Sequence, residues 1–404
     1  MRILQIDKYF YHKGGAETVF FNTIDLLRKH GHEVIPFCLQ NTKNEDSEYA
    51  PFFSNYPELS ESSLGAKIKN MPRFFYNREA AKKLELLIQK ERPALAHIHL
   101  LFNGHSISIL PVLKKYGIPV VMTVHDYRLL CPAYTFRNGK GDICEKCIDQ
   151  KYIRCAIHKC SKGNSINSLL LSLEFYFRKY TYPPIEYINK FIFVSKFSQD
   201  KHIKFNPLYL QKSSFLYNFT PDTQRSFIPE KEKKYMLYFG RLSEEKGIET
   251  LLKSITHTPH IPLKIVGTGP LLQRLKNNAP AHVEFLGFKQ GEELKQIVEN
   301  AYFTIVPSEW YENNPLSVIE SLAVGTPVIG SNIGGIPELI NGNKNGFLFD
   351  AFQTRSLVKT IDQAWSLNLE NYRALSYSSR LFAKNNCSQE AHYNKLINIY
   401  NTLL

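Results

Sequence analysis

Residues 303–330 read FTIVPSEWYENNPLSVIESLAVGTPVIG, and this stretch decides the fold. The apolar residues 303–306 predict a buried strand, the apolar spacing over 315–324 predicts a helix, and residues 327–330 predict a second strand. Two strands joined by a helix form a βαβ unit, in which the strands run parallel in one sheet. The stretch therefore predicts an α/β fold.

The same alternation continues through the rest of the chain. Further strands are predicted at residues 3–6, 34–37, 94–99, 120–124, 191–194, 235–240, 263–266 and 283–285. Helical spacing lies between them, for example at residues 19–27, 248–255, 271–276 and 292–300. Residues 218–234 are rich in proline and charge and predict a linker. We therefore expect two doubly wound domains, residues 1–218 and 219–379, followed by a helical segment, residues 380–404.

Length and composition agree with a folded chain of two domains. The 404 residues suffice for two domains of about 200 residues, each with its own core. A hydrophobic content of 43% and a charged content of 22% are typical of folded proteins and exclude a fibrous or disordered chain. The first residues, MRILQID, read as a buried strand and not as a signal peptide, so we expect a cytoplasmic protein.

The net charge of +13 is concentrated in the first half, because residues 1–190 carry +9 of it. The positive electrostatic field of this half can attract nucleic acid, an anionic membrane surface or a phosphorylated substrate. The charge alone does not distinguish among these three partners. The chain has none of the signatures of a zinc finger or an RNA-binding sheet, which argues against nucleic acid.

Two glutamates in the opening stretch are the most specific signal for chemistry. Glu312 precedes the predicted helix and Glu320 lies inside it, with seven residues between them. Pro315 suits the first helical position, so the loop of Asn313 and Asn314 offers backbone N–H groups at the positive end of a helix dipole. Eight helical residues advance about 12 Å, so the two carboxylates can contact different parts of one long ligand. A nucleotide sugar has that length, although a solvated helix face is the alternative.

Cations and glycines follow two other strands of the second domain. The segment YFGRLSEEK delivers Arg241 and Lys246 to the carboxyl end of a strand, where open α/β sheets bind ligands. Two cations can stabilise the charge on a leaving diphosphate in place of a metal ion, and the chain contains no Asp-x-Asp pair. In IVGTGP, Gly267 and Gly269 allow close backbone approach, as an ordinary tight turn also requires.

Two loops of the first domain are candidates for the same site. The turn KGGAE places Gly14, Gly15 and Glu17 between the first strand and helix, where N–H groups can face a phosphate or an acceptor. His125 and Asp126 directly follow a strand, where a histidine is equally often structural. The cluster His97, His99 and His105 suggests a metal only weakly, because no carboxylate or cysteine completes a ligand set.

Five of the seven cysteines lie in an insert at residues 131–160. Cys144 and Cys147 form a C-x2-C pair, and Cys131 and Cys160 lie farther out on either side. Four thiolates at this spacing can bind a structural zinc ion, whereas reduced thiols on a loop are the alternative. Cys155 and His158 are competing ligands.

Two further stretches combine basic and apolar residues. Residues 66–90 mix lysine and arginine with aromatic side chains, and residues 166–182 are apolar and then basic. This combination is typical of helices that lie in a membrane interface, and equally of a core helix with a charged outer face.

The segment from Glu312 to Glu320 resembles the E-x7-E motif of retaining glycosyltransferase family 4. The following GTPVIGSNIGGIPELI and GFLF are similar to the family's next segment, and the resemblance is strongest over residues 235–350. It implies the GT-B fold, in which two Rossmann-like domains face each other across a cleft. The donor then binds mainly to the second domain and the acceptor to the first, and the final helix crosses back to the first domain.

The resemblance also implies roles for the candidate residues. Glu320 would bind the nucleotide ribose, Glu312 a hydroxyl of the donor sugar, and Arg241 and Lys246 the diphosphate. A family histidine that contacts the donor sugar corresponds to His125, which completes the candidate catalytic set. The candidate donor-binding set is Glu320, Asn313, Asn314, Pro315, Leu316, Gly240, Gly267 and Gly269, and the candidate acceptor and phosphate loop is Gly14, Gly15 and Glu17. Many family members carry glycine or another small residue at the two positions that Asn313 and Asn314 occupy here. This departure of the chain from the family pattern affects the choice of donor.

The sequence therefore predicts a metal-independent, retaining hexosyltransferase. Its donor is a nucleotide-diphosphate sugar, with UDP favoured, and its acceptor is a glycan or a lipid-linked glycan of surface polysaccharide synthesis at a membrane. No cofactor is expected to be required, apart from the structural zinc ion considered above. The alternatives are a nucleotide-sugar epimerase, for which no acid/base pair is identified, and an inactive scaffold, against which the intact Arg, Lys, Glu and Glu set argues.

Overall fold

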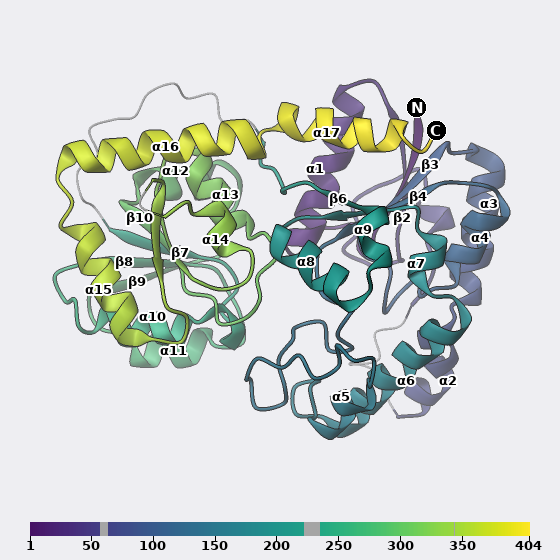
Figure 1. The fold of residues 1–404 in the computed structure, drawn as a ribbon, viewed down its shortest axis with the longest axis horizontal. Coiled ribbons are helices and arrows are strands. Elements are labelled where there is room, and N and C mark those ends of the chain that lie inside the picture. Colours follow the sequence, from purple (N-terminus) through teal and green to yellow (C-terminus); the bar gives the residue numbers. More distant parts are fainter. Residues whose placement is uncertain (57–63, 222–234, 343) are drawn as a thin grey trace. The chain divides into compact units, whose positions relative to one another are not determined.

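The computed structural model describes residues 1–56, 64–221, 235–342 and 344–404, which form two compact units (Figure 1). The first unit consists of Met1–Val194, Ser198–Leu216 and Tyr393–Leu404, and the second of Ser195–Phe197 and Tyr217–His392. Residues 222–234 of the predicted linker lie outside the described residues.

The first unit is built on a parallel six-stranded sheet with the strand order β2-β1-β3-β4-β5-β6. Its strands are β1 (Arg2–Ile6), β2 (Glu33–Phe37), β3 (Leu95–Ile98), β4 (Val120–Val124), β5 (Lys190–Phe193) and β6 (Ser213–Phe215). The first five are the predicted strands. The edge strand β6 was not predicted, because its sequence SSF carries only one large apolar residue.

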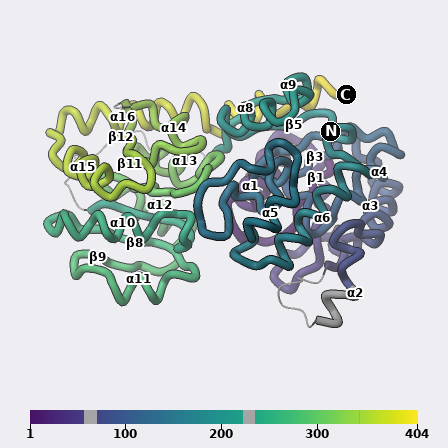
Figure 2. The backbone as a smooth tube through the Cα atoms, turned by 60° about the horizontal axis from the view of Figure 1, so that its bottom comes forward, coloured from purple at the N-terminus to yellow at the C-terminus, as the bar shows by residue number. Residues whose placement is uncertain are grey.

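The first unit also contains helices. They are α1 (Gly15–Lys29), η1 (Ala50–Phe52), α2 (Leu64–Phe75), α3 (Arg78–Glu91), α4 (Ile109–Lys115), α5 (Ile153–Ile157), α6 (Ser165–Thr181), α7 (Pro184–Tyr187), α9 (Leu208–Lys212), and most of α8 (Lys196–Phe205) and α17 (Gln389–Asn401). Figure 2 shows α3 and α4 next to each other. The apolar face of α1, with Phe20, Ile24 and Leu27, is buried in the core as its spacing predicts.

The second unit repeats the design, with the strand order β12-β11-β10-β7-β8-β9. Its strands are β7 (Met236–Phe239), β8 (Leu263–Val266), β9 (Val283–Gly287), β10 (Phe303–Val306), β11 (Val328–Ser331) and β12 (Gly346–Phe349). Its helices are η2 (Glu244–Lys246), α10 (Ile248–Ile255), α11 (Leu272–Asn278), α12 (Gly291–Asn300), α13 (Leu316–Ala323), α14 (Ile336–Leu339), α15 (Thr354–Trp365) and α16 (Leu369–Cys387). The predicted βαβ unit is β10, α13 and β11, and all sheet pairings are parallel.

The C-terminal segment joins the first unit later than predicted. Ala383 and Cys387, near the end of α16, are buried in the core of the second unit. Leu396 and Tyr400 of α17 are buried in the core of the first unit. The boundary therefore lies at Tyr393 and not at residue 380, because the apolar face of α16 packs on its own unit along its whole length.

Asparagine side chains cap the N-termini of α3, α6 and α16. The side chain of Asn77 accepts the Ala80 N–H at the start of α3, and Asn164 does the same for Asn167 at the start of α6. Asn368 accepts the Asn371 N–H at the start of α16. Each cap satisfies an N–H group that has no partner within the helix.

The two stretches with mixed basic and apolar character differ in the structure. Leu84, Leu87 and Ile88 of α3 are buried in the core, so residues 78–91 form a core helix with a charged outer face. In α6, by contrast, Ile166 is 79% exposed and Tyr180 is 73% exposed. The side chains of residues 66–69 lie outside the described residues. Throughout the described part of the chain, no helix combines the length and the apolar character that crossing a membrane requires.

Candidate functional site

Two of the candidate residues of the second unit, Lys246 and Glu312, meet where β7 and β10 end. These two strands are neighbours in the sheet, so their carboxyl ends lie side by side. β7 leads into Gly240 and the exposed Arg241, followed by η2, which ends at Lys246. β10 leads into the loop that carries Glu312. Residues 66 positions apart in the sequence are therefore brought together.

Lys246 and Glu312 form an ion pair. Lys246 Nζ lies 2.6 Å from Glu312 Oε1, and the hydroxyl of Ser308 donates to the same oxygen over 2.8 Å. The Glu312 side chain is 7% exposed and the Lys246 side chain 26%. Burial opposes ionisation of Glu312, but the Lys246 charge and these hydrogen bonds outweigh it and lower the pKa of the carboxyl. Glu312 is therefore an ionised carboxylate near pH 7.

Glu320 is a carboxylate of a different kind. It lies in α13, and burial raises its pKa to about 7. A carboxylate in such surroundings is stabilised by hydroxyl or N–H donors. The pKa values of the two glutamates are thus shifted in opposite directions, because Glu312 has a cationic partner and the pKa of Glu320 is shifted by burial alone.

The loop between the glutamates is tied down by its neighbours. Asn314 Oδ1 accepts the Asn218 N–H over 2.8 Å, and Asn218 Nδ2 donates to the Asn314 carbonyl over 3.0 Å. Asn313 and Asn314 are both buried, at 6% and 5% exposure. Within the described residues the buried Asn314 Nδ2 has no hydrogen-bond partner.

The predicted helical position of Pro315 is off by one residue. α13 begins at Leu316, and Pro315 is its N-cap with an extended ψ of 123°. The Pro315 carbonyl accepts the Val318 N–H over 3.1 Å, as an N-cap carbonyl does. The first N–H groups of α13 have no acceptor within the helix, and they follow Glu312 closely in the sequence.

Sequence reasoning missed two glycines that hold this loop. A Cβ atom on Gly334 would lie 2.4 Å from the Glu312 carbonyl oxygen, and one on Gly335 would lie 1.9 Å from that of Asn313. The Gly335 N–H also donates to the Glu312 carbonyl over 2.7 Å. A Gly-Gly pair soon after a predicted strand was the sequence signal that could have indicated this close approach of two loops. Ser308 was missed as well, although it lies only four residues before Glu312.

Gly240, Gly267 and Gly269 hold neighbouring loops together. A Cβ atom on Gly267, whose φ is +135°, would lie 1.9 Å from the Gly240 carbonyl oxygen. A Cβ atom on Gly269 would lie 2.3 Å from the Leu242 carbonyl oxygen. The observed close approach is between the loops after β7 and β8, and contact of these glycines with a nucleotide stays a prediction.

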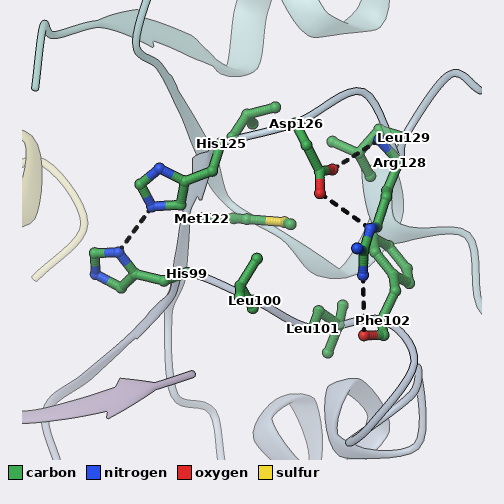
Figure 3. A pocket seen from close by; sticks show the side chains of 10 residues that line it. His99, Leu100, Leu101, Phe102, Met122, His125, Asp126, Arg128 and Leu129 are labelled. Carbon is green, nitrogen blue, oxygen red and sulfur yellow. Dashed lines mark hydrogen bonds and ion pairs between the residues drawn. The ribbon is translucent and has the colours of Figure 1, made fainter. Parts of the chain in front are cut away.

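In the first unit, His125 and Asp126 follow β4 and line a small hollow (Figure 3). Asp126 Oδ2 lies 3.0 Å from Arg128 Nε. His125 lies beside His99, which follows β3, at 3.0 Å between Nε2 and Nδ1. Burial lowers the pKa of His125 to about 4, so the ring is neutral near pH 7.

The Gly-Gly loop lies at the start of α1. Gly14 is the N-cap without a side-chain cap, and Gly15 is the first helical residue. Both glycines are exposed, whereas Glu17 is 6% exposed. Burial raises the pKa of Glu17 and, together with the Glu17 charge, raises that of the fully buried Asp7 at the end of β1. Sequence reasoning missed Asp7, whose position directly after β1 was a signal.

The insert of residues 131–160 forms loops and the short helix α5. Burial raises the pKa of Cys131 and of Cys147 to about 12 each. Within the described residues, which include all seven cysteines, no group of three or more His, Cys, Asp or Glu side chains could hold a metal ion. Zinc at Cys131, Cys144, Cys147 and Cys160 stays a prediction from spacing. The histidines His97 and His99 take part in hydrogen bonds within the protein, and His105 Nε2 bonds the Asp7 carbonyl over 2.8 Å.

Comparison with known proteins decides the family. Residues 13–222 match Glycosyltransferase Family 4, and residues 220–382 match Glycosyl transferases group 1. The chain is a family 4 glycosyltransferase. The predicted family and the predicted GT-B fold of two Rossmann-like domains are both confirmed.

Relatives and solved structures agree with this assignment. The chain is 24% identical over 347 residues to an uncharacterized 42.6 kDa protein in the cps region of Klebsiella pneumoniae, covering 82% of this chain and 84% of that protein. It is 29% identical over 136 residues to a putative colanic acid biosynthesis glycosyltransferase of Escherichia coli, covering 30% of this chain and 34% of that one. The fold matches Anabaena HepE in complex with UDP-glucose, with a TM-score of 0.67, 16% identity and 100% of both chains covered.

Proposed function

We propose that this glycosyltransferase moves a hexose from a UDP-sugar to a glycan or lipid-linked acceptor, with retention at the anomeric carbon and without a catalytic metal ion. The observation that carries the proposal is the buried Lys246–Glu312 ion pair beside the N-terminus of α13. In this arrangement a cation can bind a diphosphate and a carboxylate can accept a hydrogen bond from a sugar hydroxyl. The backbone N–H groups can donate to either ligand group.

In this proposal each side chain has one task. Arg241 and Lys246 stabilise the negative charge that develops on the departing diphosphate. Lys246 remains within reach of Glu312, so the carboxylate keeps its charge while it accepts a hydrogen bond from the sugar. Glu320 accepts hydrogen bonds from the ribose hydroxyls, which stabilise its ionised form.

Retention follows if bond making and breaking occur on the same face of the sugar. The bond from the anomeric carbon to the diphosphate oxygen breaks, and the bond to the acceptor oxygen forms. The acceptor's proton passes to the departing phosphate oxygen, so no enzyme carboxylate need attack the sugar. Exclusion of water from the site then favours transfer over hydrolysis.

The choice of UDP and of the pathway rests on the relatives. HepE of Anabaena has been solved in complex with UDP-glucose, which supports a UDP-hexose here. The relatives from a cps region and from colanic acid biosynthesis support a role in making surface polysaccharide.

An acceptor at a membrane is supported by α6. Ile166, Leu169, Leu173 and Tyr180 are 42% to 79% exposed and recur at helical spacing on one side of the helix. Lys162 precedes this face and Lys179 lies at its end. We expect the protein to sediment with vesicles that contain anionic lipid, and Ile166→Asp with Leu173→Asp to abolish this. Leu404→Asp, at another exposed apolar residue, is the control. Equal sedimentation of all variants would remove the membrane from the proposal.

Donor binding is tested by thermal stabilisation with UDP-, GDP- and ADP-sugars in EDTA. Ligand at about 100 times its dissociation constant should add about 2.7 kcal/mol to the wild type. Glu320→Ala should lose this gain, whereas Glu370→Ala, at an exposed position on α16, should keep it. Stabilisation that requires magnesium would contradict metal independence, and none at all would favour an inactive scaffold.

Retention is tested on the product. The anomeric configuration of the transferred sugar is read from the proton NMR spectrum of the reaction mixture. We expect the same configuration in donor and product. An inverted product would refute retention, and an isomerised nucleotide sugar without transfer would identify an epimerase.

A further inference from the structure

Two side chains of opposite charge line the hollow that lies beyond the ends of β3 and β4 (Figure 3). Asp126 Oδ1 accepts the backbone N–H of Arg128 over 2.9 Å, and Asp126 Oδ2 lies 3.0 Å from Arg128 Nε. Apart from this pair and two histidines, the lining is apolar. Arg128 therefore supplies the permanent positive charge of the hollow.

The Arg128 guanidinium is held in place and is still accessible. Its Nη1 donates to the Phe102 carbonyl oxygen over 3.5 Å, and Figure 3 shows the group between Asp126 and Phe102. Its central carbon lies 4.7 Å from the centroid of the Tyr134 ring. The Arg128 side chain is nevertheless 22% exposed, so part of the fixed group can reach a ligand.

A second arginine lies directly behind the first. Arg178 of α6 is buried, and its Nη2 donates to the Arg128 carbonyl oxygen over 2.7 Å. The guanidinium carbon of Arg178 lies 4.1 Å from the ring centroid of Phe102, which lines the hollow, and 3.5 Å from that of Phe175. Arg178 therefore fixes the backbone of Arg128 and brings a second positive charge close to the hollow.

The carboxyl groups near these arginines compensate their charges only in part. Glu174 Oε2 lies 3.5 Å from Arg178 Nε, but burial raises the pKa of Glu174 against the opposing charges of the two arginines. Burial also raises the pKa of Glu17 on α1, although the charge of Arg128 is among those that oppose this shift. A carboxyl with a raised pKa carries less negative charge at a given pH. The excess of positive charge favours an anionic ligand.

We propose that Arg128 is a specificity-determining residue that binds an oxyanion of the acceptor, a carboxylate or a phosphate group, at the hollow. That the anion belongs to the acceptor rests on the proposed function, whereas the binding of an anion does not. The N–H groups of a guanidinium match the oxygens of both kinds of oxyanion. The hollow has room for about one water molecule, so one oxygen of the group enters it while the sugar ring stays outside.

Binding is measured by ligand-observed NMR titration of the full chain in saturating UDP, which occupies the proposed donor site. The probes are methyl glucoside, methyl glucuronide and methyl glucoside 6-phosphate, which differ only at C6. We expect one anionic probe to bind about ten-fold more tightly than the neutral one, because it gains a charge-assisted hydrogen bond. A preference for the glucuronide identifies a carboxylate, and a preference for the phosphate identifies a phosphate. Equal affinity for all three probes overturns the proposal.

Arg128→Gln tests the assigned residue. It should lower the affinity for the preferred anionic probe to that for methyl glucoside. Arg154→Gln is the matched control, because Arg154 also lies beside an aspartate, with Asp149 Oδ2 at 2.9 Å, and donates to a carbonyl oxygen, that of Lys146, over 2.7 Å. A preference that survives in Arg128→Gln, or that both variants lose equally, contradicts the role of Arg128.

Asp126→Asn decides the question even where Arg128→Gln fails to fold. Its amide oxygen can still accept the Arg128 N–H, but the negative charge beside the guanidinium is gone. The affinity for the preferred anionic probe should rise about two- to five-fold, and that for methyl glucoside should stay the same. If the pair were only structural, anion binding would fall or stay unchanged, and either result speaks against the proposal.

The affinity for UDP separates the acceptor from the donor. Arg128→Gln should bind UDP as tightly as the wild type does. Weaker binding of UDP to this variant would identify the anion as the donor diphosphate and overturn its assignment to the acceptor. Absence of UDP binding in the wild type would instead defeat the proposed function, while the comparison of Arg128→Gln with Arg154→Gln still decides whether Arg128 binds the anion.

Discussion

Removal of the Lys246 charge should destabilise the second unit in a pH-dependent way. At 2.6 Å and an effective dielectric constant of about 20, the gross attraction between Lys246 and Glu312 is about 6 kcal/mol. Desolvation of both groups offsets part of it, and the Lys246 side chain is 26% exposed. Breaking a buried pair costs about 3–5 kcal/mol, so we expect about 2–4 kcal/mol for Lys246→Met at pH 8.

The sign of the pH dependence follows from the pKa of Glu312. In the wild type this pKa is lowered, so the carboxylate contributes stability above its unfolded value of about 4.5, and the contribution is lost only as pH falls through the folded value. Burial is the largest of the effects on the pKa of Glu312, so we expect this pKa to rise when Lys246 is removed. The variant therefore loses stability as pH rises through that raised value, and its deficit is largest at pH 8 and smaller at pH 5.

Differential scanning calorimetry across this pH range measures the effect. A loss of about 2–4 kcal/mol corresponds to a fall in Tm of about 5–12 °C for a unit of this size. Glu312→Gln combined with Lys246→Met should recover part of the loss, because no unpaired charge remains buried. Lys264→Met is the control, since Lys264 pairs with a 59% exposed Glu284 over 3.4 Å and should cost less than about 1 kcal/mol. A deficit that is the same at pH 5 and pH 8, or no larger than that of Lys264→Met, would refute the reasoning.

Three further predictions follow from the same structure. Because the pKa of Glu320 is about 7 and ribose hydroxyls would bind its ionised form, the affinity for UDP measured by calorimetry should fall up to about ten-fold per pH unit below 7, and Glu320→Gln should abolish that dependence. Burial raises the pKa of Asp7, so the contribution of this side chain to the stability of the fold is lost as pH rises through its pKa in the folded protein. Asp7→Asn should therefore raise Tm by about a few degrees at pH 8, and this gain should vanish toward pH 4. Gly335→Ala places a Cβ atom 1.9 Å from the Asn313 carbonyl oxygen and should cost about 1–3 kcal/mol in chemical denaturation, whereas Gly342→Ala, with no atom within 4 Å, should be neutral.

The fold was predictable because its signal is local. Each buried parallel strand is a short apolar run, and the helices between them carry apolar residues at helical spacing, so the sequence alone predicts the alternation. β6 was missed because an edge strand needs fewer apolar residues. The boundary at Tyr393 was missed because α16 and α17 are both amphipathic, and spacing does not tell which core each one joins.

For the site, the sequence by itself determined which residue types follow which strands: Arg241 and Lys246 after one, Glu312 after another and His125 after a third. Only the tertiary structure decided that Lys246 pairs with Glu312 and that Arg128, in the loop after β4, contacts Phe102, in the loop after β3. The physical reason is strand order. β7 and β10 are neighbours in one sheet and β1, β3 and β4 in the other, although long segments separate them in the sequence, and no local pattern of residues specifies which strands become neighbours.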